Sequence, residues 1–119
     1  MPTGSGPRKV IIALYGEEVA PRFDLTTAAH VVRLRTDGRI RDEQTVILPH
    51  ASAEEFCHLI LKEEAQVLIC NGIEDEYYQY LTWKRVDVID SVMGPWPRVL
   101  RAFREKRLTG GQSFYLVEG

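Results

Sequence analysis

The stretch KVIIALY, residues 9–15, decides how this chain folds. After Lys9 every side chain in it is apolar, and several are β-branched. An unbroken apolar run of this length, bounded by glycine and proline, is typical of a strand that is covered on both faces. We therefore expect residues 9–15 to form the central strand of a sheet that has helices on either side.

A hairpin follows the central strand. In HVVRLR, residues 30–35, apolar side chains alternate with arginines, which is the pattern of a half-buried strand. The pair Asp37-Gly38 is a strong signal for a tight β-turn. The returning strand is expected over residues 40–48, and Pro49 ends it. These two strands should pair antiparallel.

The second half of the chain alternates helices with short strands. Ser52 and Glu55 form a capping box that predicts a helix ending near Ala65. A helix over residues 74–84 carries a stripe of Tyr77, Tyr80 and Leu81 that predicts core packing and leaves Tyr78 free for a partner. Short strands are expected over residues 67–70 (VLIC) and 86–89 (VDVI). A third helix is expected to begin at Gly94-Pro95 and to stop at Gly110-Gly111. Its apolar stripe consists of Trp96, Val99, Leu100 and Phe103.

The order of elements predicts an α/β fold of the ribonuclease H-like type. Strands that arrive through helices lie parallel to the first strand, because such crossovers are right-handed. We expect a five-stranded mixed sheet of order 3-2-1-4-5, with strand 2 antiparallel and three helices distributed over both faces. Residues 1–8 read as a disordered leader, and residues 9–119 as a single domain.

The composition of the chain argues against several classes of function. The chain has 119 residues and a net charge of −2, and its acidic and basic residues are interspersed, which does not favour nucleic acid binding. No apolar run approaches the ~18 residues of a membrane span, and no signal peptide is visible. A cytoplasmic location is therefore expected, with Cys57 and Cys70 as free thiols. We expect a monomer or a weak homodimer.

Ligands of open α/β sheets bind outside the carboxyl ends of the parallel strands. The loops expected there span residues 16–24, 70–73 and 90–96. The last two lead into helix N-termini, whose N–H groups favour an anion. The residues alone leave open the alternative that the glycines of these loops merely end their elements.

Two motifs at these loops carry a resemblance. VAPRFD, residues 19–24, and LICNGI, residues 68–73, closely resemble stretches of the dinitrogenase iron-molybdenum cofactor family, which includes the NifX and NafY carriers and the C-terminal part of NifB. VDVI, residues 86–89, and Gly94 fit its closing segment, so that the resemblance covers residues 9–110. It implies a ribonuclease H-like domain that binds an iron-molybdenum or other metal-sulfur cluster and exchanges it with donor or acceptor proteins.

The resemblance also implies a set of binding residues. Arg22 would offer charge and hydrogen bonds to an anionic cluster, and Cys70 a soft thiolate as a metal ligand. This sequence departs from the family at Asn71, where a second glycine is usual, and at Glu74, Asp75 and Glu76, which would repel an anion. The complete set of implied cofactor-binding positions is Gly16, Pro21, Arg22, Phe23, Cys70, Asn71, Gly72, Ile73 and Gly94.

Catalysis is not expected. Ribonuclease H chemistry needs carboxylates on the first strand and at the end of the fourth to hold two metal ions. The first strand has none, and the fourth ends in Cys70. Two alternatives to a cluster carrier stay open: an interaction or regulatory module that has lost the cluster, and a sensor of small anions or nucleotides that uses the same loops.

Overall fold

The computed structural model describes residues 8–115. Of the predicted leader, residues 1–8, only Arg8 is described, and it begins the first strand; the remainder lies outside the described residues. The strands are β1 (Arg8–Tyr15), β2 (Glu18–Val19), β3 (Ala28–Leu34), β4 (Ile40–Ile47), β5 (Val67–Ile69) and β6 (Asp87–Ile89). The helices are α1 (Ala53–Lys62), α2 (Asp75–Trp83) and α3 (Trp96–Arg104), and η1 (Phe23–Leu25) is a short 3₁₀ turn.

The sheet has the predicted topology. Its order is β4-β3-β1-β5-β6, with β1 antiparallel to β3 and parallel to β5, and β5 parallel to β6. This confirms the order 3-2-1-4-5 that the sequence predicts. The loop expected after the first strand contains an additional short strand, β2, which folds back on β1 through a turn at Gly16.

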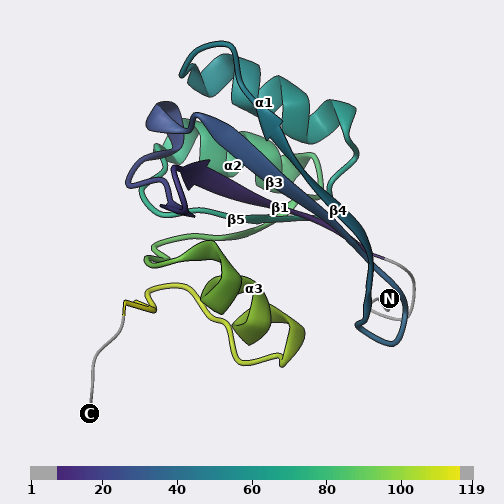
Figure 1. Ribbon diagram of the computed structural model, residues 1–119. Helices are drawn as coiled ribbons and strands as arrows, with labels where there is room; N and C mark the ends of the chain where they lie inside the picture. Colours follow the sequence, from purple (N-terminus) through teal and green to yellow (C-terminus); the bar gives the residue numbers. More distant parts are fainter. Residues whose placement is uncertain (1–7, 116–119) are drawn as a thin grey trace.

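The central strand is buried on both faces. Residues Val10 to Ala13 of β1 are completely inaccessible to solvent, and Leu14 is almost so. Ile11 and Ala13 pack toward α1 and α2, whereas Val10, Ile12 and Leu14 pack toward α3. Figure 1 shows α1 and α2 on one face of the sheet and α3 on the other. Helices on both faces are therefore confirmed, and each face has its own apolar core.

The helix beginnings follow the sequence signals. Ser52 caps α1 through its hydroxyl oxygen, which accepts a hydrogen bond from the Glu55 N–H at 3.2 Å. Pro97 lies in the first turn of α3, where its missing N–H leaves no helical hydrogen bond unmade. In the stripe of α3, Val99 and Leu100 are buried, and Trp96 and Phe103 pack against the same core.

The helix ends were harder to predict. All three helices end in a Schellman motif in which a charged residue, not glycine, adopts a positive φ: Glu64 at 57°, Arg85 at 70° and Lys106 at 61°. Consequently α3 stops at Arg104, and the prediction that Gly110-Gly111 ends it is wrong. The motif closes each helix with two backbone bonds, which offset the cost of the left-handed residue.

The stripe of α2 needs a correction. Leu81 is buried and Tyr77 packs against the core, as expected, but Tyr80 is 41% exposed. Tyr78, which was expected to lie free, packs against the core in its place. Nearby Trp83 is 73% exposed and its ring lies 6.1 Å from that of Tyr80. Within residues 8–115, no helix is long and apolar enough to cross a membrane.

Replacing Glu64 by glycine is expected to stabilise the protein by about 0.5–1 kcal/mol, because it removes the left-handed strain and an acidic charge at the negative end of α1. Lys62→Gly, two residues earlier within the helix, is the control and should destabilise it by about 1 kcal/mol. Urea denaturation measures both. A loss of stability in Glu64→Gly would contradict this account of the helix end.

Candidate functional site

The three predicted loops meet at the carboxyl ends of β1, β5 and β6, which we call the rim. Arg22 and Gly72 form a parallel bridge, in which the Phe23 N–H donates to the Gly72 carbonyl at 2.6 Å. The Val19 N–H donates to the Gly94 carbonyl at 3.0 Å, and the Val92 N–H to the Cys70 carbonyl at 3.0 Å. The backbone therefore brings Arg22, Cys70 and Gly94 into one region.

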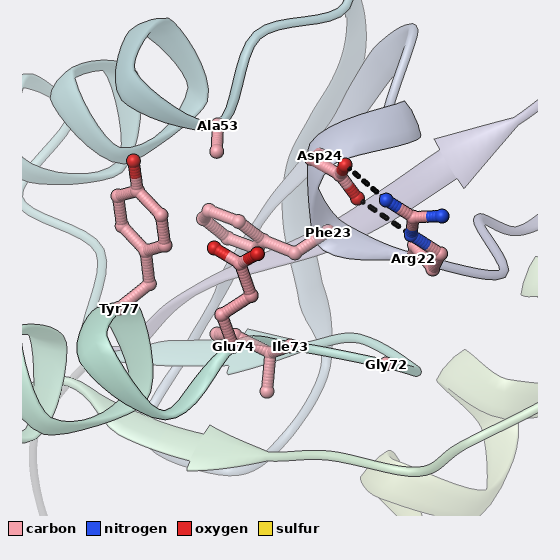
Figure 2. Close-up of a pocket in the computed structure, with 8 residues that line it drawn as sticks. All are labelled: Arg22, Phe23, Asp24, Ala53, Gly72, Ile73, Glu74 and Tyr77. Atoms are coloured by element: carbon pink, nitrogen blue, oxygen red, sulfur yellow. Dashed lines mark hydrogen bonds and ion pairs between the residues drawn. The ribbon is translucent and has the colours of Figure 1, made fainter.

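An open cavity of about 230 Å³ lies at the rim. Phe23 is buried between Phe56 and Tyr77, at ring separations of 4.8 and 5.5 Å, and this stacking fixes the apolar side of the cavity. Figure 2 shows the lining residues, which come from η1, the start of α1, the loop after β5 and α2. They are Arg22, Phe23, Asp24, Ala53, Gly72, Ile73, Glu74 and Tyr77.

Arg22 is engaged by a neighbouring carboxylate. Its Nη2 lies 2.6 Å from Asp24 Oδ2, and its Nε donates to Asp24 Oδ1 at 3.0 Å. These bonds raise the pKa of Arg22 and lower that of Asp24. In Figure 2 the guanidinium turns toward Asp24, away from Phe23 and Tyr77. With Glu74 also in the lining, the acids of the cavity offset the single cation.

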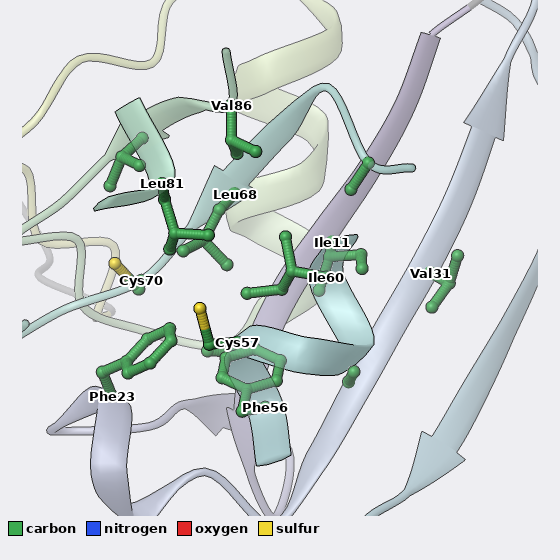
Figure 3. Close-up of a cluster of buried hydrophobic side chains, with 14 of the residues drawn as sticks. Ile11, Phe23, Val31, Phe56, Cys57, Ile60, Leu68, Cys70, Leu81 and Val86 are labelled. Carbon is green, nitrogen blue, oxygen red and sulfur yellow. The ribbon is translucent and has the colours of Figure 1, made fainter. Parts of the chain in front are cut away.

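The Cys70 thiol belongs to the core. Its side chain is fully inaccessible and packs in the cluster of β1, α1 and α2, as Figure 3 shows. Burial raises the pKa of Cys70 to about 12, and the negative charge of Asp90 adds to this effect. A thiolate is the form that binds metal. Ligation by Cys70 stays a prediction, and in this structure it requires the thiol both to leave the core and to lose its proton.

At two of the predicted glycines, another part of the same chain packs where a ligand would otherwise approach the backbone. A Cβ at Gly72 would lie 3.1 Å from the Pro21 carbonyl oxygen. A Cβ at Gly94, whose φ is +126°, would lie 2.8 Å from the backbone carbon of Phe114. Residues 113–115 cross the rim over Gly94, and Ser113 forms a parallel bridge with Met93. Both glycines permit packing of the protein against itself.

The predicted residues therefore divide into two groups. Arg22, Phe23, Gly72 and Ile73 line the cavity together. The other five lie around it: Pro21 and Asn71 are neighbours in the same loops, Cys70 is in the core, Gly94 lies under Phe114, and Gly16 is in the β1–β2 turn. Within residues 8–115, no three side chains of His, Cys, Asp or Glu are grouped so that they could hold a metal ion.

Sequence reasoning missed three lining residues. Asp24 stands in the quoted VAPRFD motif, and its spacing of two from Arg22 could have suggested the ion pair. Tyr77 was assigned to the core, which it does contact, but it also lines the cavity. Ala53 follows the α1 cap and carries no signal of its own.

Comparison with solved structures finds the same fold in several proteins. A Methanocaldococcus jannaschii protein provisionally described as a dinitrogenase superimposes with a TM-score of 0.71 at 20% identity, over 86% of this chain and 92% of that one. A Thermotoga protein provisionally described as NifB gives 0.64 at 18% identity, over 94% and 99%. The apo form of the orange protein from Desulfovibrio gigas gives 0.66 at 16% identity, over 84% and 89%.

These likenesses confirm, at the level of the fold, the resemblance to the dinitrogenase iron-molybdenum cofactor family that the motifs indicate. At identities of 16–20% they bear on architecture and leave the ligand open. No protein-family model matches the sequence, and no curated protein matches it either.

The Arg22–Asp24 pair predicts a pH dependence. The folded state lowers the pKa of Asp24, so that the pair stabilises the protein above the unfolded value of about 3.9 and is lost as the pH falls through the lower folded value. A pH titration followed by carboxyl ¹³C NMR should give an Asp24 midpoint below about 3.9. Arg22→Gln should raise it, whereas Arg98→Gln should not; an unchanged midpoint in Arg22→Gln would contradict the pairing.

The two cysteines should differ in reactivity. Burial raises the pKa of both thiols, but Cys57 lines an open cavity between α1 and α2, and Cys70 is sealed in the core. With iodoacetamide at pH 8, native Cys70 should react more than about a hundredfold slower than in urea, because the thiolate is the nucleophile. Peptide mass spectrometry should find Cys57 modified first. Equal rates for the two native thiols would refute the sealed position of Cys70.

Proposed function

We propose that the chain is a non-catalytic binding protein that carries an anionic metal-sulfur cluster as cargo and passes it between donor and acceptor proteins. The observation that supports this most directly is the joint lining of one open cavity by Arg22, Phe23, Gly72 and Ile73. These four come from the two motifs on which the family resemblance rests. The shared fold of the dinitrogenase-like and NifB-like proteins agrees with it.

The geometry favours noncovalent holding of that cargo. Cys70 is protonated and sealed at neutral pH, so no thiolate of the rim is available. Phe23, Ile73 and Tyr77 offer an apolar wall, and Arg22 offers a cationic fork that Asp24 already orients. Glu74, which lines the cavity, does not cap the first turn of α2 with a side-chain bond, so the backbone donors of that turn are not taken by a side-chain cap.

The carboxylate of Glu74 opposes this cargo. It lines the cavity, is exposed, and is followed by Asp75 and Glu76 in the first turn of α2. These acids suit the positive end of the α2 dipole, but they repel an anion that docks beside them. A substitution at Glu74 therefore distinguishes most clearly whether the cluster binds at the rim or elsewhere on the protein.

The test is reconstitution without oxygen using ferrous iron, molybdate and sulfide, read by visible absorption and by metal per protein. We expect Arg22→Gln to lower cluster retention several-fold and Glu74→Gln to raise it, because the two change the local charge in opposite directions. Cys70→Ala should keep the absorption band while lowering stability. Arg98→Gln, at the start of α3, is the control for net charge.

Two results would overturn the carrier proposal. One is a colourless wild-type protein that takes up neither metal nor sulfide. The other is a band that Cys70→Ala abolishes while Arg22→Gln and Glu74→Gln leave it unchanged, because the cluster would then be ligated by the thiol and not held at the cavity.

A second candidate is an interaction module that has lost the cluster. It is supported by the groove of about 390 Å³ between α1 and α2, which is lined by Cys57, Leu61 and Tyr80. The Tyr80 ring lies 6.1 Å from that of exposed Trp83. Exposed aromatic residues around a groove are common anchors for a protein partner. A colourless protein whose binding to a defined partner is lost in Trp83→Ala would favour this function.

A further inference from the structure

A second cavity, of about 180 Å³, lies at the end of the sheet opposite the rim. Three segments form it: the start of β1, the turn between β3 and β4, and the end of α3. Figure 1 shows the β3–β4 turn and the start of β1 together at this end, far from η1. Its lining residues are Arg8, Leu34, Arg35, Thr36, Asp37, Gly38, Phe103, Arg104 and Lys106.

Four cations line this cavity, and two of them are held in place. Arg104 Nε donates to the Gly38 carbonyl at 3.2 Å, which ties α3 to the β3–β4 turn. The Arg8 guanidinium lies 5.4 Å from the centre of the Phe103 ring, a cation–π arrangement. Among the described residues, the side chains of Arg35 and Lys106 form no hydrogen bond or ion pair.

The acids near the cavity are already paired with other cations. Asp37, which lines it, lies 3.8 Å from Arg39 Nε and accepts the Arg39 N–H at 3.0 Å. Glu105 lies 2.8 Å from Arg107 Nη2. Neither Arg39 nor Arg107 lines the cavity. The four lining cations therefore gather at one place without a matching set of carboxylates.

The helix dipole accounts for only part of this arrangement. Cations are favoured at the C-terminal end of a helix, which explains Arg104 and Lys106 at the end of α3. It does not explain Arg8 in β1 or Arg35 beside the turn. The carbonyl end of α3 contributes about half a negative charge, much less than the four positive charges around it.

We propose that this cavity binds a compact multivalent anion of the di- or polyphosphate class. Arginine forks match phosphate oxygens in pairs, and a lysine adds a point charge. The volume equals that of about six water molecules at ~30 Å³ each, which suits a small phosphate group and not a folded polymer. The rim, with Asp24 and Glu74 in its cavity, is the less favourable end for such a ligand.

Inorganic pyrophosphate is the probe, added to the metal-free protein with chloride at matched ionic strength as the reference. Isothermal titration should detect one site, and ¹⁵N NMR should find the largest amide shifts in residues 35–38 and 103–106. Arg35→Gln and Lys106→Gln should each weaken binding by about fivefold or more, because each loses a charge-assisted contact. Both side chains lack partners among the described residues, so the fold should persist in urea denaturation.

Arg98→Gln is the matched control, because it removes the same charge from the opposite end of α3 and should leave the affinity unchanged. Equal weakening by all three variants, shifts centred on the rim, or no binding beyond that of chloride would overturn the proposal. So would tight binding of a single-stranded oligonucleotide that pyrophosphate does not displace. Because no metal is present, these results are independent of the cluster experiment.

Discussion

Burial of β1 on both faces is the constraint on which the rest of this structure depends. Its side chains alternate between the core under α1 and α2 and the core under α3, so neither helical layer can be lost without exposing it. Since β1 also pairs antiparallel with β3 and parallel with β5, it fixes the register of both halves of the sheet. The rim is the place where this strand and its parallel neighbours end together.

The rim is closed largely by the chain's own backbone. The Gly72 backbone packs against the Pro21 carbonyl oxygen, and Phe114 covers Gly94. A glycine that permits close approach therefore does not by itself indicate a ligand, because here the second partner is another part of the same protein. What remains open is the cavity between η1 and α2, where an apolar wall meets one cation and two acids.

The sequence was sufficient for the topology and insufficient for the site. Strand order followed from KVIIALY, the Asp37-Gly38 turn and the alternation of helices with strands. These signals are local, and the right-handedness of the helical crossovers then determines on which side each later strand is added. Helix ends were less predictable, because Glu64, Arg85 and Lys106 take a conformation usually reserved for glycine. The burial of the Cys70 side chain and the gathering of four cations at the second cavity depend on segments distant in sequence, so periodicity could not place them. The Arg22–Asp24 pair is local, and only its spacing of two hinted at it.

The charges of this molecule are unevenly distributed over its surface. Acids stand in the first turns of α1 and α2, namely Glu54, Glu55, Asp75 and Glu76, whereas the first turn of α3 has none and its last turn carries Arg101 and Arg104. Although the net charge is only −2, charge of each sign is concentrated locally, with acids at these helix starts and four cations around the second cavity. A charged surface that it approaches in dilute salt favours the orientation in which the region of opposite charge arrives first. At physiological ionic strength this orienting torque is screened beyond a Debye length of about 8 Å, which restricts it to the last step of an encounter.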